Sequence, residues 1–199
     1  MNTASKSNVV RLSHVLEKEY GTISWYPRRD AINELVYTIL SQHTSDINSE
    51  RAFDNLITHF ESTEAISNAD ILEIQQCIKT AGLHKIKAER IKKVLNIIDA
   101  RIGGFDLSFL AEMPLEIAKS WLKSLPGIGP KTAAIVLCFS FGMPAMPVDT
   151  HIYRVSRRLG LIDSKASADK AHDLMEKIVD PDKIFHFHMY LIKHGRKVC

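Results

Sequence analysis

The segment SLPGIGPKT, residues 124–132, joins two predicted helices through glycines at alternate positions. Gly127 and Gly129 permit a positive φ and place no side chain over the backbone. Pro130 suits the start of a helix, where unpaired N–H groups and the positive dipole end attract anions. The pattern predicts a hairpin that binds phosphate through its backbone, with Ile128 dropping between the two helices. A plain helix–helix turn is the alternative.

Lys131 and Asp149 are the candidates for covalent chemistry. The positive end of a helix dipole disfavours the charged form of Lys131, and a neutral amine can form a Schiff base with a sugar carbon. Asp149 precedes a predicted helix and can stabilise positive charge on a sugar ring or activate a nucleophile. Each residue also has a simpler interpretation, because Lys131 can pair with a phosphate and Asp149 can cap its helix.

The elements that must position these residues are helical. Apolar residues recur at three- and four-residue steps, for example at Ile32, Leu35, Val36, Ile39 and Leu40, and no stretch alternates as a strand does. The sequence predicts an all-α fold of about ten helices. It contains no apolar run of the roughly 18 residues that a membrane span needs, and its first residues lack a signal-peptide pattern. Three widely spaced cysteines argue against a disulfide scaffold, so we expect a cytoplasmic protein in a reducing compartment.

Positive charge is concentrated along the chain. The formal net charge is only +3, with 26 basic and 23 acidic residues, but residues 79–101 are strongly basic. Such a stripe indicates either a bound polyanion or a solvated helix face.

Four segments together resemble the endonuclease III family of DNA glycosylases, the helix-hairpin-helix/Gly-Pro-Asp superfamily. They are LPGIGPKTAAIVLCFSFGMPAMPVDTHIYRVSRRLGL (125–161), LSQHTSD (40–46), IKTAGLHKIKAERI (78–91) and HGRKVC (194–199). The resemblance implies a two-lobed, all-α fold with a DNA-binding cleft between the lobes. Residues 26–142 would form the central bundle with the hairpin (about 116–142), and residues 1–25 plus 143–199 would form the second lobe.

The same resemblance implies a bifunctional DNA glycosylase and AP lyase of base excision repair. Lys131 falls on the Schiff-base lysine and Asp149 on the catalytic aspartate. The enzyme would remove oxidised or damaged pyrimidines. The expected partner is double-stranded DNA containing damaged bases or abasic sites, bound by a monomer, and the expected location is the cytoplasm, in association with the nucleoid. The alternatives are a mismatch-specific thymine or adenine glycosylase of the same fold and a non-enzymatic helix-hairpin-helix DNA-binding module.

DNA contacts follow from the resemblance as well. Leu83 falls on a wedge residue, and either Gln42 or His43 falls where a second side chain enters the duplex. The remaining expected contacts are Lys85, Lys87, Gly127, Ile128, Gly129 and Thr132.

Cysteine usage departs from the family pattern. Many members hold a [4Fe–4S] cluster on four cysteines, and Cys199 matches only the first of them. Because one cysteine cannot hold such a cluster, we expect no cofactor in this chain, and a [4Fe–4S] cluster only if the natural product extends beyond Cys199. Cys77 and Cys138 are predicted to be core thiols.

Overall fold

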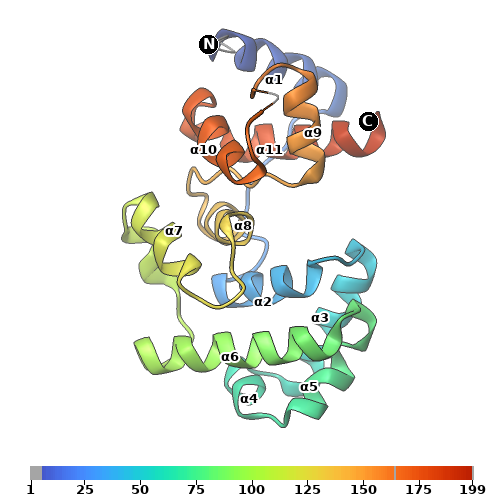
Figure 1. The fold of residues 1–199 in the computed structure, drawn as a ribbon, viewed down its shortest axis with the longest axis vertical. Coiled ribbons are helices and arrows are strands. Elements are labelled where there is room, and N and C mark those ends of the chain that lie inside the picture. Colours follow the sequence, from blue (N-terminus) through green and yellow to red (C-terminus); the bar gives the residue numbers. More distant parts are fainter. Residues whose placement is uncertain (1–5, 164, 199) are drawn as a thin grey trace.

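The structure is a computed structural model that describes residues 6–163 and 165–198. Eleven α-helices and no strand occur in these ranges, which confirms the all-α prediction (Figure 1). The α-helices are α1 (Lys6–Tyr20), α2 (Ala31–Ser41), α3 (Asp46–Phe60), α4 (Thr63–Asn68), α5 (Ile71–Cys77), α6 (His84–Ile102), α7 (Leu115–Lys123), α8 (Pro130–Phe141), α9 (Thr150–Arg158), α10 (Ala168–Ile178) and α11 (Ile184–Lys197). Three short 3₁₀ turns, η1 (Lys79–Ala81), η2 (Ser108–Glu112) and η3 (Pro181–Lys183), connect some of them.

Side-chain caps set where many of these helices begin. Asp30 accepts a hydrogen bond from the Asn33 N–H at 2.8 Å, and the Ser45, Ser62, Asp70, Asp149 and Ser167 side chains make the equivalent bond at later helix starts. Such a cap satisfies one of the N–H groups that lack a partner in the first helical turn. Short polar residues before apolar periodic segments therefore divide the chain into its helices.

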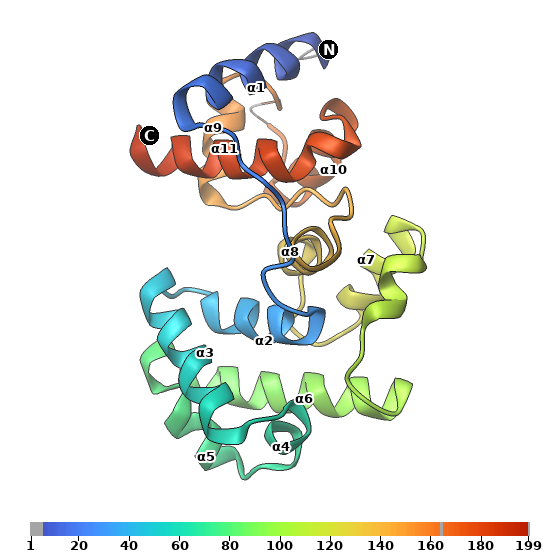
Figure 2. The same ribbon diagram turned by 180° about the vertical axis from the view of Figure 1, so that it is seen from behind.

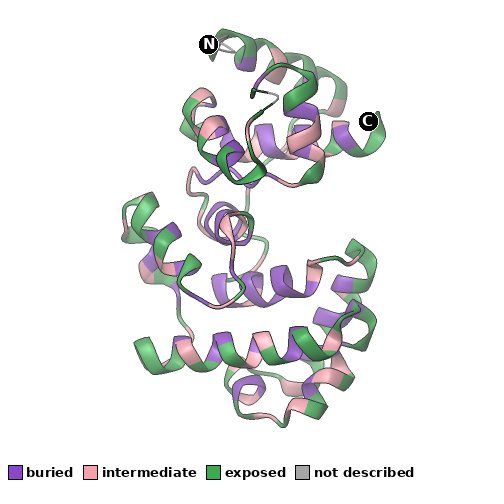
Figure 3. Ribbon diagram, viewed as in Figure 1, coloured by how far each residue is buried: buried purple, intermediate pink, exposed green. Residues whose placement is uncertain are grey.

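The first hydrophobic core lies in the lobe formed by α2 to α7 together with part of α8 (Figures 1 and 3). Its fully buried side chains include Leu35, Ile39, Leu56, Ile91 and Leu95. The buried faces of α2 and α6 both turn toward this core. This packing holds α6, which begins just after Leu83, against α2, which ends at Ser41.

The second core lies in the other lobe and is built from both ends of the chain. Helix α1 lies beside α11 in both views (Figures 1 and 2). The Tyr20 hydroxyl lies 3.0 Å from His194 Nδ1, and the Tyr190 hydroxyl donates to the Gly21 carbonyl at 3.2 Å. The second lobe therefore contains the N-terminal helix as well as α9, α10 and α11.

Helix α8 contributes to both cores. Ala133, Val136 and Leu137 belong to the first cluster, and Cys138 and Phe139 belong to the second. Its place between the lobes is visible in Figure 1, where it is seen end-on. The boundaries at residues 25/26 and 142/143 stay a prediction, but the helix that carries Lys131 is packed by both lobes.

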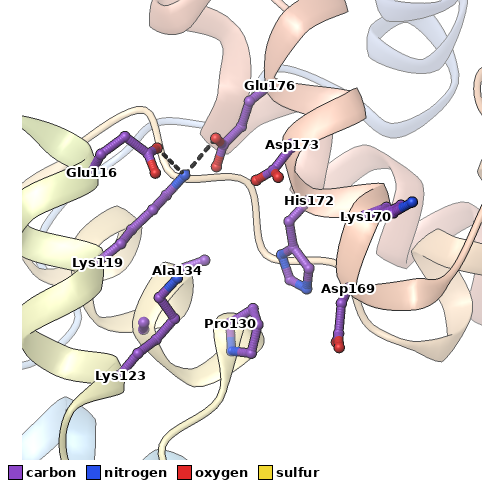
Figure 4. Close-up of a pocket in the computed structure, with 11 residues that line it drawn as sticks. Glu116, Lys119, Lys123, Pro130, Ala134, Asp169, Lys170, His172, Asp173 and Glu176 are labelled. Carbon is purple, nitrogen blue, oxygen red and sulfur yellow. Dashed lines mark hydrogen bonds and ion pairs between the residues drawn. The ribbon is translucent and has the colours of Figure 1, made fainter.

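A buried ion pair joins the lobes beside α8. Lys119 of α7 lies 2.5 Å from Glu176 of α10 and 2.9 Å from Glu116, and Figure 4 shows the three side chains converging. Glu176 also accepts a hydrogen bond from the Met146 N–H at 2.8 Å.

Of the helices in the described ranges, none is long and apolar enough to cross a membrane.

Candidate nucleic-acid interface and catalytic residues

The hairpin between α7 and α8 has the conformation that its sequence predicts. Gly127 lies at φ +76°, in the left-handed region that favours glycine. The Ile128 side chain is 5% exposed and belongs to the first core, which confirms that it packs between the helices. The Ile128 N–H donates to the Leu125 carbonyl at 3.2 Å, so this amide is not free for a phosphate. Ile128 stabilises the turn from inside, which corrects its expected direct contact with DNA.

Most of the remaining amides of the hairpin lack an acceptor among the described residues and are the candidate anion site. Within residues 6–163 and 165–198, no hydrogen-bond acceptor is found for the N–H groups of Gly127, Gly129, Lys131 and Thr132. Three of them belong to the N-cap and first turn of α8, where the helix dipole is positive. The Thr132 side chain is buried, so only its backbone is available to a ligand. This arrangement suits a phosphate oxygen.

Arg90 of α6 was missed by the sequence analysis. A Cβ built on Gly127 would lie only 2.8 Å from Arg90 Cζ, so the guanidinium rests against the hairpin backbone. Arg90 Nη1 also donates to Gln42 Oε1. Arg90 thus connects the hairpin to the turn after α2. Its spacing from Lys87, three residues along the buried side of α6, is the signal that could have identified it.

Lys131 is exposed at the first turn of α8. No ion pair or side-chain hydrogen bond is found for its ammonium among the residues that the structure describes. An amine in this position is open to a ligand that the hairpin binds, because no carboxylate neutralises it. The side chain is therefore accessible for either of the two roles considered above.

Asp149 caps α9, with Oδ1 accepting from the Ile152 N–H at 2.7 Å. The second carboxylate oxygen has no hydrogen bond among the described residues and remains available. The capping interpretation is therefore correct, and it leaves room for a further role. The cap holds the carboxylate at the end of the segment that leads from α8.

His188 of α11 lies within electrostatic reach of both candidates. Its side chain is 3% exposed, and burial lowers its pKa to about 4, although Pro147 and the charge of Asp149 oppose this shift. The charge of Lys131 also acts on the ring. The imidazole is therefore neutral near pH 7, with Nδ1 donating to the Pro147 carbonyl at 2.9 Å. His188 was not predicted from the sequence, because a lone histidine on an apolar helix gives no distinct signal.

The two turns with the predicted wedge residues lie side by side. Thr44 Oγ1 donates to the Ala81 carbonyl, which joins the turn after α2 to the turn before α6. His43 is exposed at φ +54° and Leu83 is 56% exposed at φ +47°. Gln42 is half-buried and bonded to Arg90. Of the two alternatives that the sequence left open, His43 is the side chain that faces outward.

Lys87 was expected to contact DNA, and this expectation is wrong. Its side chain is 2% exposed, and its ammonium donates to the Leu40 carbonyl, Thr44 Oγ1 and the Ala81 carbonyl. Burial lowers the pKa of Lys87 to about 8, and nearby Arg90 adds to the shift. The resemblance and the basic stripe misassigned this residue, because a lysine in such a stripe is usually solvated. Lys85, two positions earlier, is exposed and remains a predicted phosphate contact.

The described cysteines do not fit an iron–sulfur cluster. Cys138 is buried in the second core and Cys77 packs at the edge of the first, so they lie in different parts of the molecule. No group of three cysteine, histidine, aspartate or glutamate side chains in the described ranges could hold a metal ion. Cys199, the one predicted cluster ligand, lies outside the described residues.

Comparison with known proteins identifies the family. The model of the HhH-GPD superfamily of base excision DNA repair proteins matches residues 36–181. Endonuclease III of Thermotoga maritima is 32% identical over 170 residues, 85% of this chain and 75% of that protein. Endonuclease III of Sulfolobus acidocaldarius is 35% identical over 173 residues, 86% and 75% of the two chains. A relative from Arabidopsis thaliana is 31% identical, and the chain spans 60% of its length.

Solved structures agree with these relatives. A non-covalent endonuclease III–DNA complex superposes with a TM-score of 0.83 at 26% identity, covering 99% of this chain and 88% of that chain. A trapped covalent endonuclease III–DNA intermediate gives a TM-score of 0.81, also at 26% identity, covering 98% and 87%. The fold, the hairpin and the family match agree. The chain therefore belongs to the HhH-GPD superfamily of base excision DNA repair proteins, as a DNA glycosylase related to endonuclease III.

Proposed function

We propose that this chain is a bifunctional DNA glycosylase and AP lyase that removes oxidised or damaged pyrimidines from duplex DNA. The observation that carries the proposal is the exposed Lys131 amine, which has no acid partner among the described residues and sits beside the free amides of the hairpin. A phosphate held by those amides would bring the neighbouring sugar to this amine. Monofunctional glycosylases do not need a lysine here, whereas a lyase needs an amine nucleophile.

The chemistry requires a neutral amine as nucleophile and departure of the base as a leaving group. Lys131 Nζ would attack C1′ of the flipped nucleotide while the bond from C1′ to the base breaks and the base takes the electron pair and then a proton. Asp149 would accept the proton that the amine loses and stabilise positive charge on the sugar. The bond from C1′ to the ring oxygen then breaks, the ring oxygen takes the proton held by Asp149, and a Schiff base forms between Nζ and C1′. Loss of a C2′ proton then expels the 3′ phosphate by β-elimination and nicks the strand.

The exposed wedge residues support a substrate in duplex DNA. A glycosylase must take its target nucleotide out of the stack, which costs a few kcal/mol. His43 and Leu83 stand on adjacent turns, and one polar and one apolar side chain can fill the gap left behind. The exposed Lys85 and the hairpin amides would hold phosphates on either side.

The test is nicking and trapping on defined duplexes. The protein is incubated with duplexes carrying thymine glycol, uracil, a thymine–guanine mismatch or an abasic site, with and without borohydride. We expect base release from thymine glycol, strand nicking, and a covalent adduct that Lys131→Ala abolishes. Lys183→Ala, which removes an exposed lysine of η3 in the second lobe, is the matched control and should leave the adduct unchanged.

Each other outcome selects an alternative. Release only from the mismatch would make the chain a mismatch glycosylase. Specific binding without release or nicking would make it a DNA-binding module. An undiminished adduct in Lys131→Ala would place the nucleophile elsewhere and refute the lyase assignment.

A further inference from the structure

Lys87 is buried without a counter-charge. Its ammonium lies 2.6 Å from the Leu40 carbonyl, 2.6 Å from Thr44 Oγ1 and 2.8 Å from the Ala81 carbonyl. An ammonium has three protons, so these three oxygens use its whole donor capacity. No carboxylate pairs with it among the residues described, and a buried cation held only by neutral oxygens is costly to maintain. Packing alone therefore does not explain why this cation is buried.

The three oxygens belong to two separate turns and the helix that precedes them. Leu40 is in the last turn of α2, where carbonyls lack helical partners. Thr44 lies in the turn at residues 42–45, hereafter the first turn. Ala81 is the last residue of η1 and lies within the turn at residues 79–83, hereafter the second turn. One side chain from α6 therefore ties together segments that are about forty residues apart in the sequence.

Each of these turns contains a residue in an unfavourable backbone conformation. His43 in the first turn and Leu83 in the second have positive φ angles, which only one other non-glycine residue in the described ranges shares, Glu61. The left-handed region is unfavourable for a non-glycine residue, so it persists only where surrounding contacts enforce it. The hydrogen bonds from Lys87 to both turns are contacts of this kind, because their acceptors, on Thr44 and Ala81, lie within two residues of the strained positions.

We propose that Lys87 is a positioning residue that holds His43 and Leu83 at a fixed separation, so that both enter the duplex together when the target nucleotide leaves the stack. This inference rests on the proposed function, because it assigns the two side chains to duplex opening. Lys87 does not touch the substrate. It acts through the two turns, and its contribution belongs to the opening of paired DNA rather than to the chemistry at Lys131.

The test measures the rigidity of the two turns separately from their role in opening the duplex. Lys87→Met keeps an unbranched chain but removes the donors, and Thr44→Val removes one acceptor with little change in shape. Lys93→Met is the matched control, because Lys93 is an exposed lysine of the same helix with no bond among the described residues. Amide hydrogen exchange is measured over both turns. Base release is measured on a fully paired duplex and on a lesion within a three-nucleotide unpaired bubble.

We expect amide exchange in both turns to rise at least tenfold in Lys87→Met, less in Thr44→Val, and not at all in Lys93→Met. Base release from the paired duplex should fall at least tenfold in Lys87→Met, while release from the bubble should fall less than threefold. Equal losses on both substrates, or no loss on the duplex, would overturn the proposal. If Lys87→Met does not fold, the same measurements on Thr44→Val decide. A wild-type protein that is inert on every substrate would refute the proposed function, and unchanged exchange would still refute the positioning role separately.

Discussion

Gly127→Ala tests the conformation of the hairpin. Gly127 lies at φ +76°, and a Cβ there would meet the Arg90 side chain, with Cζ at 2.8 Å. The substitution therefore adds two separate penalties. Alanine is strained at this φ, and the new methyl group displaces a guanidinium that otherwise bonds to Gln42.

The magnitude follows from these two penalties. A left-handed alanine costs about 1 kcal/mol relative to glycine. Loss of the hydrogen bond from Arg90 adds about 1 kcal/mol, less than is usual for a charged donor because this side chain is only half-buried. We expect the free energy of unfolding to fall by about 2 kcal/mol, which for a chain of this length lowers Tm by roughly 4–8 °C.

The assay is thermal unfolding with a matched control and a double-mutant cycle. Gly129→Ala is the control, because Gly129 lies at φ −95° and its Cβ would meet no atom within 4 Å, so the loss should be about 0.5 kcal/mol. In an Arg90→Ala background, Gly127→Ala should cost only about 1 kcal/mol, since the clash is gone. Equal costs in both backgrounds, or a smaller loss than Gly129→Ala gives, would refute the reasoning.

Three further predictions concern Asp149, His188 and the ion pair between the lobes. Asp149→Asn should reduce base release at least a hundredfold in a glycosylase assay. Tm and DNA affinity should be unchanged, because asparagine caps α9 equally well. A large loss of Tm would instead make the residue mainly structural. The pKa of His188, about 4 against an ordinary 6.5, means that the unfolded chain binds more protons between these values. The free energy of unfolding should therefore fall by about 3 kcal/mol from pH 7 to pH 4, and denaturant titrations of His188→Asn should lack this part of the decline. Lys119→Met should cost about 3 kcal/mol in urea unfolding because it strands the buried Glu176, whereas Lys183→Met, at an exposed pair, should cost less than about 1 kcal/mol; equal costs would contradict the buried role.

Much of the fold could be predicted because local signals agree. Short polar caps such as Asp30 and Ser167 precede apolar residues at helical spacing, and the helices begin at those caps. The hairpin was predictable for the same reason, since Gly127, Gly129 and Pro130 each have few conformational alternatives.

The side chains that hold the site together could not be predicted in this way. Lys87 and Arg90 look like parts of a solvated basic stripe, and only the packing of α6 against the turn after α2 turns them inward. The burial of His188 depends on α11 crossing the second core, which no spacing within its own helix reveals. Long-range packing decided each of these cases, and periodicity carries no information about it.

The contact between α1 and α11 has a consequence for synthesis of the chain. Residues 31–128 of the first core are contiguous and can fold as they leave the ribosome, because domains generally fold as units during translation. Helix α1 is made before this core, yet its neighbours on α11 lie about 170 residues further along the chain. Its apolar face, including Val9 and Leu16, must therefore stay uncovered until α11 has been made. During that interval α1 would be exposed to chaperones, proteases and misassembly.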